Sequence, residues 1–148
     1  MATALIIVDM QNDFLPGGAL AVARGDEIVD EINRISRAYD LVVATQDWHP
    51  RNHGSFASQH EGARLYEIGE LAGMPQVMWP DHCIQGTLGA ELTRHLDQER
   101  VDAIFRKGTD VKIDSYSAFF DNGHQKATGL AGYLQGRGVT EVHIAGLA

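Results

Sequence analysis

Four short apolar runs constrain the fold of this chain more than any other feature of its sequence. Each run is bounded by turn or helix residues, which is typical of parallel strands buried on both faces of a sheet. The runs are A-L-I-I-V, L-V-V-A-T, V-D-A-I-F and E-V-H-I-A, at residues 4–8, 41–45, 101–105 and 141–145. They predict four buried strands in a parallel sheet.

Helical patterns lie between these runs. In residues 26–39, apolar residues recur at helical spacing and charged residues occupy the other face. Residues 89–95 predict a short helix, and residues 125–135 predict a helix that ends before Gly136 and Gly138. Strands that alternate with helices predict a three-layer α/β/α fold around an open, mainly parallel, Rossmann-like sheet.

Length and charge narrow the class of partner. A chain of 148 residues is expected to form one domain with a substantial core. Its 12 Lys and Arg against 20 Asp and Glu give a net charge of −8. Binding to nucleic acid or to an anionic membrane needs a basic surface, so both are argued against. A small-molecule substrate is the expected partner, and a homo-oligomer is left open.

The cysteine count and the N-terminus predict a cytoplasmic protein. Cys83 is the only cysteine, so no intramolecular disulfide can form, as is usual in a reducing compartment. The N-terminal segment M-A-T-A-L-I-I-V has no basic residue, and its apolar run ends at Asp9. That run is too short for a secretory signal or a membrane span.

The end of the sequence carries an expectation of its own. Only Gly146, Leu147 and Ala148 follow the fourth run. A parallel strand that is buried on both faces needs a following helix to cover it. We therefore expect residues 1–148 to form a single domain that is incomplete at its C-terminal end.

Charged side chains stand at the carboxyl ends of three predicted strands. Asp9 follows the first run, Asp47 the second and Lys107 the third. Open α/β sheets bind their ligands outside the carboxyl ends of the strands. These three residues therefore mark the expected active site.

A cluster of potential metal ligands lies beside one of these ends. Asp47, His49 and His53 occur in D-W-H-P-R-N-H, and His82 follows in W-P-D-H-C. One carboxylate with three imidazoles suits zinc, iron(II) or manganese(II). Side chains two apart on a strand point the same way, and turn residues let a later histidine fold back. The alternative is a chance cluster of surface histidines, although long aperiodic loops such as residues 47–86 are usually functional.

Six motifs together carry a family resemblance. In order they are A-L-I-I-V-D-M-Q-N-D-F, G-G-A-L-A-V, T-Q-D-W-H-P-R-N-H-G-S-F, W-P-D-H-C, F-R-K-G and S-Y-S-A-F-F. The chain resembles the nicotinamidases, an amidase group within the isochorismatase-like cysteine hydrolases. The likeness covers essentially the whole chain and roughly the first two-thirds of such an enzyme. In that family G-L-A continues as T-D-x-C, which holds the nucleophilic cysteine, and this sequence ends before it.

The resemblance implies roles for particular residues. Asp9 matches the aspartate that takes the thiol proton, and Lys107 matches the lysine that stabilises the thiolate and the developing negative charge. The nitrogen of Ala148 matches part of an oxyanion hole, within a strained, cis-type Leu147–Ala148 peptide bond.

The resemblance also implies a metal and a substrate slot. The metal ligands are Asp47, His49, His53 and His82, and the ring nitrogen of nicotinamide replaces one metal-bound water. Aromatic and apolar side chains line a flat pyridine slot, which suits ring stacking. The slot residues are Phe14, Leu20, Trp79 and Tyr116.

Each assignment has a plain structural alternative. Asp9 could cap a turn, Lys107 could be a solvated lysine, and the aromatic residues could pack in the core or in loops. Cys83 is the only thiol, but its place beside His82 favours a small packed residue behind the metal loop. The other four histidines match no motif and are expected to be structural or on the surface. They are His60, His95, His124 and His143.

The implied function is hydrolysis of nicotinamide to nicotinate and ammonia in NAD salvage, by a metal-containing cysteine amidohydrolase that also accepts other pyridine carboxamides. One alternative is another isochorismatase-like hydrolase, such as an isochorismatase or a carbamoyl-amide hydrolase; the metal cluster argues against it. A second is a non-catalytic fragment that binds metal and ligand. A third is a hydrolase that uses metal-bound water and needs no thiol.

Overall fold

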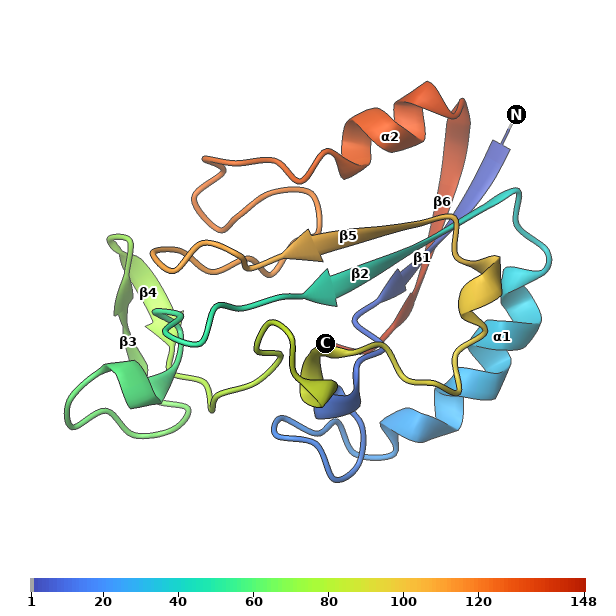
Figure 1. Cartoon of the computed structure of the whole chain (residues 1–148). Coiled ribbons are helices and arrows are strands. Elements are labelled where there is room, and N and C mark those ends of the chain that lie inside the picture. The colour runs from blue at the N-terminus through green and yellow to red at the C-terminus, as the bar shows by residue number, and fades with distance from the viewer. Residues whose placement is uncertain (1) are drawn as a thin grey trace.

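A four-stranded parallel sheet runs through the middle of the molecule (Figure 1). The structure is a computed structural model that describes residues 2–148. The strand order is β5-β2-β1-β6, and each neighbouring pair is parallel. The predicted parallel sheet is thus confirmed. Its strands are β1 (Ala2–Val8), β2 (Leu41–Asp47), β5 (Ala103–Lys107) and β6 (Val139–Gly146).

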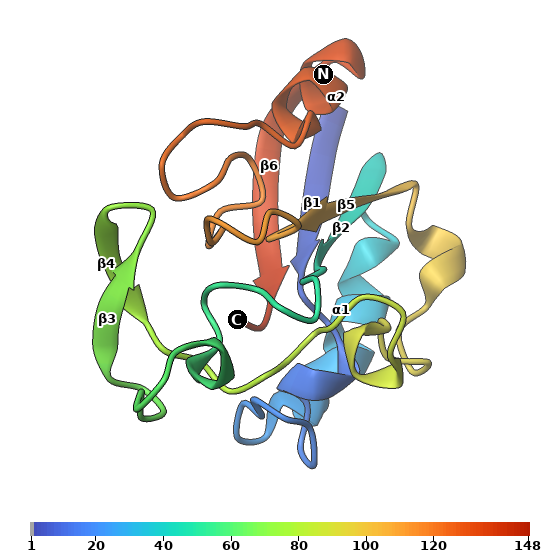
Figure 2. The ribbon, with the colours of Figure 1, turned by 60° about the vertical axis from the view of Figure 1, so that its left-hand side comes forward.

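Two helices lie on opposite faces of this sheet (Figures 1 and 2), which confirms the three-layer architecture. They are α1 (Val29–Ser36) and α2 (Leu130–Gly136). Successive side chains of a strand point to opposite faces, so β1 contributes to both cores. Ile7 packs in the core that contains α1, whereas Ile6 packs in the core that contains α2.

Both helices are shorter than predicted. The pattern over residues 26–39 begins as a 3-10 helix, η2 (Gly25–Ile28), and becomes α-helical only in α1. The pattern over residues 125–135 becomes helical only at α2, because Gly129 before it adopts a left-handed conformation with φ of 92°. The residues before Gly129 form a loop.

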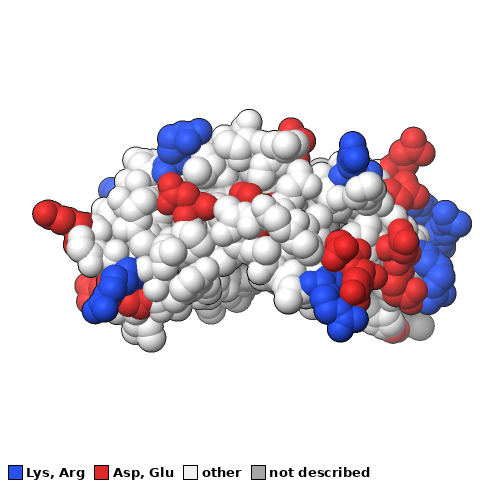
Figure 3. Space-filling view, turned by 90° about the horizontal axis from the view of Figure 1, so that it is seen from below, with Lys and Arg blue, Asp and Glu red and all other residues white. Residues whose placement is uncertain are grey.

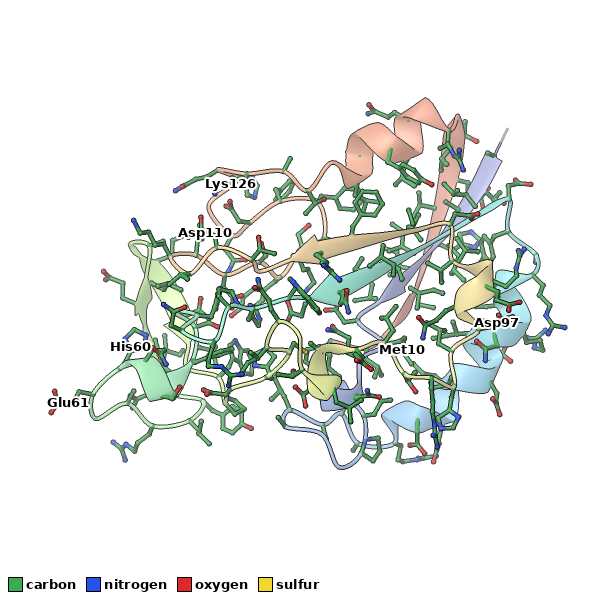
Figure 4. The ribbon with its side chains drawn as sticks, in the orientation of Figure 1. Met10, His60, Glu61, Asp97, Asp110 and Lys126 are labelled. Atoms are coloured by element: carbon green, nitrogen blue, oxygen red, sulfur yellow. The ribbon has the colours of Figure 1, made fainter. Side chains whose placement is uncertain are left out.

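The predicted helix over residues 89–95 is wrong. The segment holds only part of a 3-10 turn, η4 (Leu88–Ala90), and continues in extended conformation at Glu91. The N–H of Thr93 donates to the carbonyl of Met10 at 2.8 Å. Met10 is fully buried just beyond the end of β1 (Figure 4). The backbone groups that a helix would use are therefore bonded to the loop after β1.

The prediction that all four strands are buried on both faces is also wrong for β5 and β6. Every residue of β2 is buried, but Ile104 of β5 is 48% exposed and Ile144 of β6 is 68% exposed. β5 and β6 are the outer strands, whereas the helices pack mainly against β1 and β2.

An antiparallel hairpin projects from the side of the molecule (Figure 1). It consists of β3 (Ile68–Leu71) and β4 (Met74–Val77), within the segment predicted to be an aperiodic loop. Ala72 and Gly73 connect the strands with φ of 55° and 75°, the positive values that two-residue hairpin turns favour. The remaining short 3-10 helices are η1 (Asn12–Phe14), η3 (Ala57–Gln59) and η5 (Gln98–Arg100).

Charged side chains are unevenly distributed on the face of the molecule that Figure 3 shows. Seen from below, charged side chains gather toward the two ends of the face and leave its middle largely uncharged (Figure 3). Among residues 2–148, none of the helices combines the length and the apolar character needed to cross a membrane.

Candidate active site

Lys107 joins the carboxyl ends of three strands. It ends β5 and lies in register with Asp47, the last residue of β2. Its Nζ atom is 2.9 Å from Asp47 Oδ1 and 2.8 Å from Oδ2 of Asp9, which follows β1. All three side chains are buried. The structure therefore brings together the three charged residues that were predicted at the carboxyl ends of the strands.

Asp9 is the carboxylate of this group that holds a proton more readily. Thr45 Oγ1 donates to Asp9 Oδ1 at 2.6 Å. Burial raises the pKa of Asp9; Lys107 acts against this, but the net shift is upward. A buried carboxyl group with a raised pKa is suited to accept and return a proton during a reaction.

Asp47 has the opposite tendency. Burial alone would raise its pKa, but the charge of Lys107 and hydrogen bonds from His49 and His82 hold the pKa well below its usual value. Burial also disfavours the cationic form of Lys107, yet the two carboxylates outweigh it and raise the pKa of the lysine. Asp47 and Lys107 are therefore an ion pair, and Asp9, which also contacts Lys107, is the carboxyl group more easily protonated.

Two imidazoles face the Asp47 carboxylate. Oδ2 of Asp47 lies 3.2 Å from His49 Nε2 and 3.4 Å from His82 Nε2. The Nδ1 atoms are bonded elsewhere: that of His49 lies 2.7 Å from the carbonyl of Gly108, and that of His82 lies 2.7 Å from the carbonyl of Pro80. Each Nδ1 therefore donates to a backbone carbonyl, which orients Nε2 toward the Asp47 carboxylate, the arrangement typical of metal-binding histidines.

These three residues fit a divalent metal. Their candidate ligand atoms lie within 4.8 Å of one another, and all three residues are buried. Two imidazoles and one carboxylate form a common protein ligand set for zinc and similar ions.

His53 does not join this group. Its ligand atom clusters instead with His49 and Asp114, so His49 is shared between two triads. Burial, together with the nearby His49, lowers the pKa of His53 to about 4 and keeps its ring neutral at pH 7. Of the four predicted ligands, three meet at one point and His53 lies beside it.

Asp114 is a site residue that the sequence reasoning missed. It is buried, and its carboxylate accepts hydrogen bonds from the Ser115 N–H at 2.8 Å and from Gln76 Nε2 at 3.0 Å. It immediately precedes the S-Y-S-A-F-F motif, which was the only available signal.

A cavity of about 280 Å³ opens over this group. Asp47, His82 and Lys107 form its polar part, together with Asp114. The remaining wall is mostly apolar and includes every residue that was predicted to line a slot. Those residues are Phe14, Leu20, Trp79 and Tyr116, and Ala148 also lines the cavity.

The predicted cis-type peptide between Leu147 and Ala148 is wrong, because residues 2–148 contain no cis peptide bond. A cis bond that does not precede proline costs about 2.5–4 kcal/mol and persists only where the surroundings enforce it. Here the Leu147 N–H donates to the carbonyl of Val8 at 2.9 Å, which carries the trans chain into the cavity wall.

Cys83 is a packed residue, as predicted. It is fully buried in a small cluster with Phe14 and Ala90. Burial, with the nearby acidic side chains, raises the pKa of its thiol. A neutral, inaccessible thiol is a poor nucleophile.

Asp13, to which no role was assigned, holds the loop that carries His82. Its Oδ2 atom accepts the backbone N–H of Cys83 at 2.8 Å, next to His82 in sequence. Gly89 packs against the Asp13 carboxylate so closely that a Cβ atom there would lie 2.3 Å from Oδ2.

Three of the other histidines make structural or surface contacts. His60 Nε2 lies 2.7 Å from the carbonyl of Gly54, near the hairpin (Figure 4). His124 stacks on Phe120 with ring centroids 3.9 Å apart, and His143 contacts Glu141 at 2.7 Å on the surface. None of them reaches the site.

The loop after β5 carries an exposed ion pair. Asp110, shortly after β5, accepts from Lys126 Nζ at 3.1 Å, and the two side chains point toward each other (Figure 4). This contact ties the segment after β5 to the segment that leads into α2.

Known proteins share this chain's sequence and fold. The isochorismatase domain family matches residues 3–148. The nicotinamidase of Escherichia coli K12 is 51% identical over 98% of this chain and 70% of its own length. The solved nicotinamidase–pyrazinamidase of Acinetobacter baumanii is 49% identical with a TM-score of 0.96, over 99% of this chain and 71% of that one.

A third solved structure bears on the metal. The pyrazinamidase of Pyrococcus horikoshii in complex with zinc is 40% identical with a TM-score of 0.76, over all of this chain and 72% of that one. Family match, sequence identity and fold agree. The chain therefore belongs to the isochorismatase domain family, as a relative of the nicotinamidases.

Proposed function

We propose that this protein is a nicotinamidase, which hydrolyses nicotinamide to nicotinate and ammonia. The observation that carries this function is the group Asp9, Lys107 and Asp47 under an aromatic cavity, in a chain 51% identical to a bacterial nicotinamidase. A protein in which this chain continues into the T-D-x-C motif of the family is therefore expected to release ammonia and nicotinate in equal amounts from nicotinamide. Failure to release either product would contradict the proposal.

The cavity suits a pyridine carboxamide. Its walls hold Phe14, Trp79 and Tyr116, which can sandwich a flat ring, and its volume of about 280 Å³ leaves room for a small aromatic ligand. The hydroxyl of Tyr116 accepts a hydrogen bond from Gln76 at 3.2 Å, which fixes one edge of the slot. Other pyridine carboxamides of similar size are expected to be accepted.

The polar group suits acyl transfer. In the family that the motifs indicate, the attacking group is a cysteine thiol in a T-D-x-C motif that follows G-L-A. Asp9 accepts its proton, and the new C–S bond forms as the amide C–N bond breaks. Asp9 then returns the proton to the leaving ammonia. Water attacks the thioester in the second half, which releases nicotinate and restores the thiol. Lys107 offsets the negative charge that develops in both steps.

We further propose that Asp47, His49 and His82 hold one divalent ion, either zinc, iron(II) or manganese(II), with His53 beside it. The zinc complex of the Pyrococcus relative and the protonated Nδ1 atoms of both histidines support this assignment. When bound, the ion supplies Lewis acidity and a fixed anchor for a ring nitrogen. We also propose that residues 1–148 belong to a single isochorismatase-like domain. The protein then acts in NAD salvage in the cytoplasm.

Removal of one imidazole is expected to remove the metal. His49→Ala deletes a ligand that both triads share, so the purified variant should contain far less than one metal ion per chain, whereas the wild type contains about one. His95→Ala, which alters an exposed histidine, is the matched control and should keep the wild-type content. Plasma mass spectrometry measures all three proteins. Equal metal in His49→Ala and wild type would contradict the site.

A further inference from the structure

Gln11 bonds to the backbone of Asp47 in both directions. Its Nε2 atom donates to the Asp47 carbonyl at 2.7 Å, and its Oε1 atom accepts the Asp47 N–H at 2.9 Å. A second Nε2 hydrogen bond goes to the carbonyl of Ala90 at 2.8 Å. The Gln11 side chain is fully buried, so all of its bonds are made within the protein.

These bonds take the place of a missing strand neighbour. The pairing of β1 with β2 ends at Ile7 and Ala44, because the chain turns away at Asp9 with φ of 48°. On the other side of β2, the N–H of Trp48 donates to the carbonyl of Lys107. The N–H and C=O of Asp47 point toward the β1 side and would be buried without partners if Gln11 were absent.

The Asp47 carboxylate is sensitive to the position of its backbone. It has three partners in different directions, namely Lys107 at 2.9 Å, His49 at 3.2 Å and His82 at 3.4 Å. Partners that orient a metal ligand are typically worth about 10–100-fold in metal affinity.

We infer that Gln11 is a positioning residue for Asp47: its side-chain amide fixes the end of β2 so that the carboxylate faces both histidines and Lys107. This inference rests on the metal site proposed above. Gln11 does not line the cavity and has no hydrogen bond to His49 or His82, so it acts on them through the Asp47 backbone.

The chain offers a matched control in Gln46. This residue is also buried, lies next to Asp47, and donates from Nε2 to the same Ala90 carbonyl at 2.8 Å. Its Oε1 atom accepts from Arg106 and makes no contact with Asp47. Gln11→Met and Gln46→Met therefore both keep nearly the same side-chain volume and both remove a hydrogen bond to the Ala90 carbonyl, but only the first releases Asp47.

Zinc titration of the metal-free protein against a chromophoric chelator tests the inference. The zinc dissociation constant of Gln11→Met is expected to rise about 10–100-fold, and that of Gln46→Met to stay near the wild-type value. Gln11→Glu keeps an acceptor for the Asp47 N–H but loses both donated bonds, so it should also bind zinc more weakly. Thermal melting of each metal-free variant reports whether it is folded.

Each outcome decides the question. Equal zinc affinity in Gln11→Met and wild type, or equal losses in Gln11→Met and Gln46→Met, would overturn the role of Gln11. If both Gln11 variants are unfolded with and without zinc, Gln11 is a general structural residue and the inference is wrong. If the wild type itself binds no zinc, iron(II) or manganese(II), the proposed metal site fails first, and that result is distinct from the others.

Discussion

In a protein that also holds the T-D-x-C cysteine, replacement of Asp9 by asparagine is expected to reduce nicotinamide hydrolysis by about 10²–10⁴-fold, the usual cost of losing a general base. The substitution keeps the shape of the side chain, and an amide can still accept the hydrogen bond from Thr45 that the carboxylate accepts at 2.6 Å. It removes the group that takes up and returns a proton, together with the ion pair that this carboxylate makes with Lys107 at 2.8 Å. Lys107 keeps its second partner, Asp47, at 2.9 Å, so the ion pair beside the metal ligands survives.

Two measurements separate this effect from a structural one. Ammonia release gives the rate, and zinc titration should give an unchanged dissociation constant, because Asp9 is not among the candidate ligands. Asp110→Asn removes a carboxylate from an exposed pair with Lys126 and should leave the rate unchanged. An Asp9→Asn protein that retains more than about a tenth of the wild-type rate would show that Asp9 is not the proton acceptor.

Replacement of Lys107 by methionine should affect folding as well as catalysis. Methionine fills a similar volume, but it leaves the buried carboxylates of Asp9 and Asp47 facing each other without a cation. Removal of one partner from a buried ion pair typically costs about 3–5 kcal/mol of folding free energy. We therefore expect a loss of that order in urea denaturation, together with a loss of hydrolysis.

A surface lysine provides the comparison. Lys126 also pairs with a carboxylate, Asp110, at 3.1 Å, but its side chain is 75% exposed. Exposed pairs of this kind contribute between zero and about 1 kcal/mol, so Lys126→Met should barely change the denaturation midpoint. If the two variants lose the same free energy of unfolding, Lys107 does not stabilise the buried carboxylates of Asp9 and Asp47.

Some of this site could be predicted from sequence because of a general property of parallel sheets. Asp9, Asp47 and Lys107 are far apart in the chain, yet each stands at the carboxyl end of an apolar run, and those ends share one edge. His49 was predictable for a local reason, since side chains two residues apart at a strand end point the same way.

Other parts depend on loop geometry that no periodicity encodes. Asp114 reaches the histidines from the loop after β5, and Gln11 reaches Asp47 from the loop after β1. The helix predicted over residues 89–95 fails for a related reason. Its backbone groups are taken by Met10 and its neighbours, which are remote in sequence. Tertiary hydrogen bonds of this kind override local propensity.

The burial of Cys83 makes the metal loop observable by thiol chemistry. In the folded chain this cysteine lies behind the His82 loop, fully buried against Phe14 and Ala90, and it is the only thiol among the 148 residues. A disulfide reagent can reach it only after that cluster separates, so the rate at which Cys83 itself is labelled, read at its own peptide by mass spectrometry, reports how often the loop opens. Any ligand that holds His82 in place slows the labelling of Cys83. This cysteine therefore reports local unfolding beside the site.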